Sequence, residues 1–207
     1  MTEQMTDSFA RIADYYDGLI RKYGHDPRAC DYGRVESQKI KFRALSEVAP
    51  LANSSVLDVG CGFADFATFL GEGFPGLLYS GIDLCSAMVD EAKRNHPNLD
   101  LRVANIFDAS FDHKFDVVTA NGIFYLLGDQ AWPMMRQMIE RMYALAKTAV
   151  AFNSLSAWAT DQEPGEFYAD PLRVVDFCRR ALTPRVVLRH DYHPRDFTVY
   201  LYKADRK

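Results

Sequence analysis

The stretch Val56–Asp65, VLDVGCGFAD, decides the fold. An apolar run passes Asp58, enters a turn that contains Gly60 and Gly62, and is followed by a helical pattern. Glycines at such a junction let the backbone approach a ligand closely at the N-terminus of a helix. The stretch therefore predicts a strand, a ligand-binding loop and a helix, in that order.

The side chains around this loop favour a cationic group over a pyrophosphate. A dinucleotide-binding loop has a third glycine where this chain has Asp65, and a carboxylate there would repel a pyrophosphate. Asp58, two residues before Gly60, suits an amine better than a phosphate; the alternative for Asp58 is a turn-forming role. An NAD-dependent oxidoreductase is therefore the disfavoured alternative.

Two more polar residues end the next strand-like runs. Asp83 follows Gly60 by 23 positions, the spacing at which an acid accepts hydrogen bonds from ribose hydroxyls. Asn105 ends the third run beside Ile106, where its amide oxygen suits an adenine amino group. The alternative for Asn105 is an ordinary turn residue.

Short apolar runs alternate with amphipathic stretches after residue 53, a pattern typical of repeated β-α units with parallel strands. The predicted strands are residues 55–60, 77–84, 99–105, 115–121, 148–154, 185–192 and 197–202. The predicted helices are residues 5–23, 34–49, 63–70, 86–95, 130–146 and 171–181.

The last two predicted strands must form a hairpin, because residues 193–196 are too few for a crossover helix. The expected fold class is α/β, a doubly wound, seven-stranded, mostly parallel sheet with an antiparallel last strand. We expect one domain over residues 1–207, with residues 1–50 as an N-terminal helical cap and residues 51–207 as a Rossmann-like core.

The composition of the chain disfavours some classes of binding partner. The net charge of −4 argues against binding to a nucleic-acid backbone, and no run approaches the roughly 20 apolar residues of a membrane span. The N-terminus lacks the features of a signal peptide, so we expect a cytoplasmic protein without a membrane partner. The four cysteines are widely separated and are expected to be reduced, and no third ligand accompanies His190 and His193, so no metal site is predicted.

Three segments resemble one known family. DVGCG at residues 58–62, GIDLCSAMVDEA at 81–92 and FDVVTANGIFYLL at 115–127 resemble the class I, Rossmann-type S-adenosylmethionine-dependent methyltransferases, in particular small bacterial single-domain members. The resemblance runs from about residue 56 to residue 154 and implies S-adenosyl-L-methionine as cofactor. The cofactor-binding residues that it implies are Asp58, Gly60, Cys61, Gly62, Asp83, Leu84, Met88, Asn105, Ile106, Asn121 and Gly122.

The chain departs from the family pattern at two positions. Ala64 stands where the family often has a third glycine, and Asn105 stands where an aspartate is common. Alanine adds one methyl group and asparagine keeps the acceptor oxygen, so both departures are compatible with cofactor binding.

The resemblance implies methyl transfer by in-line displacement, and we expect the acceptor to be an oxygen or nitrogen of a small molecule. Methylation of a protein, peptide or RNA is the alternative, and a non-catalytic S-adenosylmethionine-binding module is the alternative from another class. Weak candidates for a catalytic group are Tyr125, His190 and His193. The candidates for the substrate pocket are the aromatic residues Tyr15, Tyr16, Phe124, Tyr125, Trp158 and Tyr168.

Overall fold

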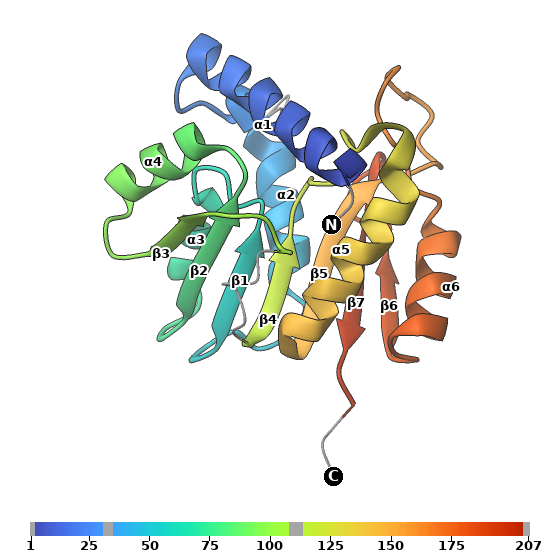
Figure 1. The fold of residues 1–207 in the computed structure, drawn as a ribbon. Helices are drawn as coiled ribbons and strands as arrows, with labels where there is room; N and C mark the ends of the chain where they lie inside the picture. Colours follow the sequence, from blue (N-terminus) through green and yellow to red (C-terminus); the bar gives the residue numbers. More distant parts are fainter. Residues whose placement is uncertain (1–2, 31–34, 108–113, 205–207) are drawn as a thin grey trace.

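A computed structural model describes residues 3–30, 35–107 and 114–204 and contains a seven-stranded sheet flanked by helices (Figure 1). The sheet has the order β3-β2-β1-β4-β5-β7-β6, and β7 runs antiparallel to both of its neighbours. The predicted fold class is confirmed. The strands are β1 Ser55–Val59, β2 Leu78–Asp83, β3 Asp100–Val103, β4 Phe115–Ala120, β5 Ala146–Leu155, β6 Val186–Arg189 and β7 Asp196–Tyr202.

The helices cover both faces of the sheet and also its carboxyl edge (Figure 1). Apolar side chains of α2, α3 and α4 join one hydrophobic cluster with the sheet, and those of α5 and α6 join another. The inner strands β1, β4 and β5 thus bury alternate residues on opposite sides, as a doubly wound sheet requires. The helical segments are α1 Glu3–Tyr23, η1 Pro27–Cys30, α2 Val35–Ser46, α3 Asp65–Gly71, α4 Ser86–Asn95, η2 Gly128–Gln130, α5 Ala131–Leu145 and α6 Pro171–Ala181.

Helix α1 crosses above the carboxyl ends of the parallel strands (Figure 1). Its first turns bury Met5 and Phe9 in the cluster that contains α5. Its last turns pack Tyr16 and Leu19 against Phe63 and Met88, beside α3 and α4. The helix therefore bridges the two halves of the molecule over the edge where ligands of such sheets bind.

Most predicted boundaries differ from the observed ones by one to three residues, and two of the differences have clear local reasons. The helix predicted from residue 63 begins at Asp65, because Ala64 has a left-handed φ of 61° and belongs to the loop. The strand predicted over residues 185–192 ends at Arg189, because His190 turns away and its ring contacts Ser156. None of the helices within the described ranges is long and apolar enough to cross a membrane.

Candidate active site

A cavity of about 270 Å³ lies at the carboxyl edge of the sheet, beneath α1. Its lining comes from the loops after β1, β2, β3 and β4, from α1 and α2, and from the β6–β7 hairpin. All eleven predicted cofactor-binding residues line it. The topology thus brings together residues that are spread over more than sixty positions of sequence.

The loop after β1 has the backbone that its glycines predicted. Gly60 and Gly62 have left-handed φ values of 75° and 53°. A Cβ on Gly60 would lie 2.4 Å from the side chain of Ile123, so this position tolerates no side chain without a shift. The amides of Gly60 and Cys61 donate to the carbonyl of Ile82, at 2.8 and 3.0 Å, and fix the loop against β2.

Asp83, at the end of β2, holds this loop to the start of α4. Its Oδ2 accepts from the amide of Gly62 at 2.8 Å and its Oδ1 from the amide of Cys85 at 2.9 Å. Burial raises the pKa of Asp83, although these two amides and that of Leu84 favour the charged form. A carboxylate can accept further bonds, so Asp83 still suits a pair of hydroxyls.

Asp58 is 3% exposed and sits deeper in the same half of the cavity. The hydroxyl of Tyr79 donates to its Oδ2 at 2.6 Å, and Thr119 donates to its Oδ1 at 3.1 Å. Burial raises the pKa of Asp58 to about 6. The hydrogen bonds from Tyr79 and Thr119 lower the pKa, and the nearby charge of Asp83 raises it, but burial has the largest effect. The carboxylate is thus energetically costly without a cationic partner.

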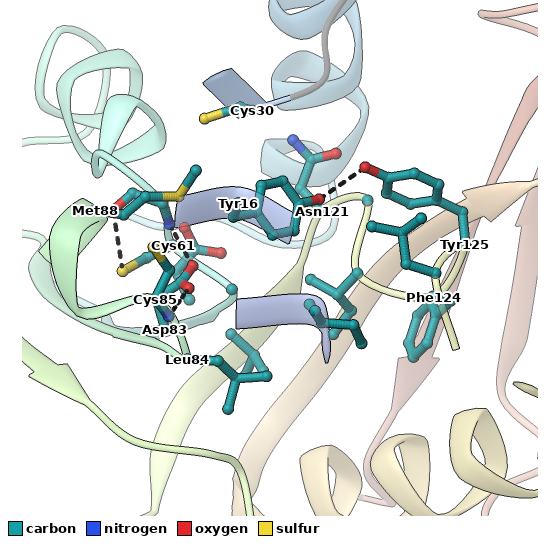
Figure 2. Close-up of a pocket in the computed structure, with 18 of the residues that line it drawn as sticks. Tyr16, Cys30, Cys61, Asp83, Leu84, Cys85, Met88, Asn121, Phe124 and Tyr125 are labelled. Carbon is teal, nitrogen blue, oxygen red and sulfur yellow. Dashed lines mark hydrogen bonds between the residues drawn. The ribbon is translucent and has the colours of Figure 1, made fainter. Parts of the chain in front are cut away.

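Leu84 and Met88 supply apolar lining to this half (Figure 2), and Ile106 also lines the cavity. Met88 and Ile106 are almost fully buried. Asn105 also lines the cavity, while its Oδ1 accepts from the amide of Phe107 at 2.8 Å. Asn105 therefore has the turn-forming role that was its alternative interpretation, and it also borders the cavity.

Asn121 and Gly122 follow β4 and are held by a residue that the sequence did not indicate. Asn153 of β5 accepts from the amide of Gly122 at 2.7 Å and donates to the side chain of Asn121. Asn153 is fully buried. It positions the loop at the boundary between the two halves of the cavity.

The second half of the cavity lies toward β5 and β7 and is bounded by aromatic and charged side chains. Tyr16 of α1 reaches across to Tyr125, and their hydroxyls lie 2.9 Å apart (Figure 2). Phe124 packs edge-on against Phe152. The charged and polar residues that line this half are Ser37, Gln38, Lys41, Glu166, His193, Arg195 and Asp196.

Four predicted site residues do not line the cavity. Tyr15 is 41% exposed because it lies one position from Tyr16 on α1 and faces another side of the helix. Trp158 is 50% exposed and stacks on His190, which lies outside the cavity with it. Tyr168 stands behind the lining, where its hydroxyl is 2.7 Å from the guanidinium of Arg195.

The sequence did not indicate that Lys41 and Asp196 would line the second half of the cavity. Lys41 lies in an amphipathic helix, where a lysine is ordinarily solvated, and Asp196 begins a strand far along the chain. In the structure they form a buried pair at 3.0 Å. Among the residues that the structure describes, no group of histidine, cysteine and acidic side chains is placed to hold a metal ion.

The fold and the site define a Rossmann-like protein with a ligand cavity at the carboxyl edge of its sheet. Residues 56–148 match a family model described as a methyltransferase domain. Rv1506c from Mycobacterium tuberculosis, which its name assigns to the methyltransferases, is 29% identical over 160 residues, or 72% of this chain and 93% of that protein. Together with the fold, these matches support a class I S-adenosylmethionine-dependent methyltransferase, the family that the motifs resemble.

Two other comparisons are informative about the range of relatives. Malonyl-[acyl-carrier protein] O-methyltransferase 1 from Ilyobacter polytropus is 30% identical over 131 residues, which cover 62% of this chain and 44% of that protein. The chain thus spans less than half of this relative. The crystal structure of N-methyltransferase NodS from Bradyrhizobium japonicum WM9, in complex with S-adenosylhomocysteine, superposes with a TM-score of 0.67 at 19% identity, covering 92% of this chain and 99% of NodS.

Proposed function

We propose that this enzyme methylates an oxygen or nitrogen of a small-molecule acceptor that binds in the second half of the cavity. The observation that carries the proposal is the position of α1, whose side chains line this half of the cavity. Helix α1 covers it, and the Tyr16–Tyr125 hydrogen bond joins the cover to the loop after β4. A covered cavity admits a small acceptor more readily than a folded macromolecule.

The first half of the cavity fits S-adenosylmethionine, which supplies an activated methyl group on its sulfonium. Asp58 and the backbone of Gly60–Gly62 would hold the methionine portion, since a buried carboxylate without a cation gains most from an ammonium group. Asp83 would bind the ribose hydroxyls. The adenine would lie among Leu84, Met88, Asn105 and Ile106.

The charges of the cavity support the same orientation. Asp58, Asp65 and Asp83 make the first half acidic, whereas in the second half Lys41 and Arg195 are balanced by Asp196 and Glu166. Opposite charges attract most strongly where water is excluded, so the cationic portion of the cofactor is favoured at the acidic half. The chain's role in catalysis is then mainly to align the acceptor with the methyl group and to exclude water.

The names of the relatives cover both types of acceptor atom. One relative is named as an O-methyltransferase of a malonyl group on a carrier protein, and one solved neighbour is named as an N-methyltransferase. These names support an oxygen or nitrogen acceptor and leave the acceptor of this chain to experiment.

The test uses methyl-labelled S-adenosylmethionine and a cell lysate divided by ultrafiltration into a low-molecular-weight filtrate and a macromolecular retentate. The proposal predicts that the enzyme transfers label to a compound of the filtrate other than S-adenosylmethionine itself. Label that enters only protein or RNA of the retentate would contradict it. Heat-denatured enzyme and Asp58→Asn serve as controls for non-enzymatic methylation.

A further inference from the structure

A second feature of the cavity, separate from the cofactor-binding loops, is a row of polar side chains that ends on a histidine. Nδ1 of His193 lies 2.7 Å from Oδ2 of Asp196, and Nζ of Lys41 lies 3.0 Å from Oδ1 of the same carboxylate. On its other side, Nε2 of His193 lies 3.2 Å from Oγ of Ser37. All four side chains line the cavity.

The carboxylate in this row is built to stay charged. Asp196 is 2% exposed, and burial on its own raises its pKa, but the close contacts with His193 and with the charge of Lys41 outweigh burial and leave the pKa below its usual value. An ionised, buried carboxylate at 2.7 Å favours the tautomer with the proton on Nδ1. The backbone amide of Arg195 donates toward the same nitrogen at 3.3 Å and on its own would favour the other tautomer, but the carboxylate contact is shorter and carries a full charge.

This tautomer leaves the lone pair of Nε2 directed toward Ser37, at the cavity wall. The other groups around the ring are Ser37 and Lys41 from α2, Asp196 from β7, and Tyr192 and Arg195 from the hairpin. A histidine that contacts a carboxylate through one ring nitrogen and presents the lone pair of the other at a cavity wall, here beside the hydroxyl of Ser37, has the arrangement of a general base.

The position of the hairpin places this nitrogen beyond the cofactor half. Ala120, the last residue of β4, pairs with Phe152 of β5, and β5 continues to Leu155, which pairs with Asp196. Three further residues of strand extend about 10 Å past the end of β4. His193 therefore stands above the sheet edge, level with the loop after β4 and on the acceptor side.

We propose that His193 is the general base of the methyl transfer and that the acceptor is protic. The acceptor group is then a hydroxyl, a phenol or a neutral nitrogen that carries a hydrogen. The inference rests on the proposed function. Nε2 takes the acceptor's proton while the acceptor's lone pair forms the bond to the methyl carbon. The electron pair of the broken carbon–sulfur bond remains on sulfur, and the proton then passes from His193 to solvent. Asp196 and Lys41 are positioning residues.

Nuclear magnetic resonance tests the inference without an acceptor. In 15N-histidine-labelled protein saturated with S-adenosylhomocysteine, the His193 ring, assigned by comparison with His193→Gln, should show the neutral tautomer with hydrogen on Nδ1. Asp196→Asn should shift the ring toward the other tautomer. A wild-type ring with hydrogen on Nε2 would overturn the inference, whatever the enzyme methylates.

The second measurement is the rate of methyl transfer, followed with the labelling assay on the low-molecular-weight filtrate. At saturating S-adenosylmethionine, His193→Gln should lower the labelling rate by about 100-fold or more, the usual contribution of a general base, and flatten the remaining fall in rate at acidic pH. His190→Gln, a histidine of the same hairpin outside the cavity, should keep the wild-type rate. Both variants should bind S-adenosylhomocysteine as the wild type does.

The outcomes separate the two proposals. An unchanged rate and pH profile in His193→Gln would overturn the base while the small-molecule function stands. Wild-type protein that binds S-adenosylhomocysteine but labels nothing in the filtrate would contradict the proposed function, and the tautomer of His193 would still decide the inference on the ring.

Discussion

At the scale of single residues, the most informative group is the buried carboxylate of Asp58. Burial raises its pKa in the folded protein to about 6, above the usual 3.8 of an aspartate, so folding favours the neutral form. The ionised group therefore costs stability as the pH rises through this interval, and the cost is fully present at neutral pH. Such a cost is typical of a residue retained for binding rather than for stability.

Asp58→Asn should therefore stabilise the unliganded protein and impair the cofactor site. We expect the free energy of unfolding at pH 7 to rise by about 1–3 kcal/mol, somewhat less than the full pKa shift implies because asparagine loses charge-assisted hydrogen bonds. Affinity for S-adenosylhomocysteine should fall at least tenfold. Denaturant unfolding and calorimetry measure both, and Asp90→Asn, an exposed carboxylate of α4, is the control.

Cofactor affinity should also depend on pH through the same group. Below pH 6 the Asp58 carboxyl is protonated in the unliganded protein and cannot pair with an ammonium. The dissociation constant for S-adenosylhomocysteine should therefore rise as the pH falls from 7 to 5, and Asp58→Asn should remove most of that dependence. An equal pH dependence in the variant would show that another group is responsible.

At the scale of elements, the loop after β1 depends on backbone conformation rather than on side chains. Ala64 adopts a left-handed φ of 61° where related loops often carry glycine, at a cost of about 1 kcal/mol for a residue with a Cβ. Gly60 cannot be replaced by alanine in the same way, because an added Cβ would collide with the side chain of Ile123.

Gly60→Ala should accordingly distort the loop. We expect a loss of about 2 kcal/mol in stability from the left-handed φ and the clash together, and a loss of measurable S-adenosylhomocysteine binding. Gly73→Ala is the matched control, because a Cβ there meets nothing within 4 Å and its φ is ordinary. Similar losses in both variants would indicate a general effect of the added methyl group.

Helix α1 is the element whose behaviour should respond to ligand. It is held over the cavity by the Tyr16–Tyr125 hydrogen bond and by the sulfur contact between Cys85 and Asp17 at 3.0 Å. Bound cofactor would add contacts beneath it. Amide hydrogen exchange over residues 3–23 should slow when S-adenosylhomocysteine binds, and slow less in Tyr16→Phe.

The control for this experiment is Tyr15→Phe, which removes a hydroxyl from the neighbouring residue outside the cavity. It should leave the ligand-induced protection as in the wild type. Exchange over α1 that is unchanged by ligand in the wild type would contradict the role of α1 as a cover.

At the scale of the whole molecule, local sequence patterns predicted the architecture and half of the cavity. Residues 86–95 and 171–181 were predicted as helices with the observed bounds, and Asp170 caps the second of them through the amides of Leu172 and Arg173. The glycines and acids after β1 and β2 carry their signal within a few positions of the strand ends, so the sequence alone could predict that these residues line one cavity.

The acceptor half was not predictable in the same way. The Lys41–Asp196 pair joins α2 to β7, and its members are ordinary surface residue types that only the tertiary fold buries. Spacing also could not separate His190 from His193, because the conformation of the hairpin decides which ring faces the cavity. Ionic pairs between distant residues, and the conformations of turns, produce no periodic pattern that can be recognised in a single sequence.

The central claim, that the acidic half of the cavity binds S-adenosylmethionine, is tested most directly by calorimetric titration with S-adenosylmethionine, S-adenosylhomocysteine and NADH. We predict binding of both sulfur compounds and no binding of NADH, with affinity lost in Asp83→Ala and kept in Asp90→Ala. Binding of NADH alone, or equal affinity for the sulfur compounds in both variants, would contradict the account.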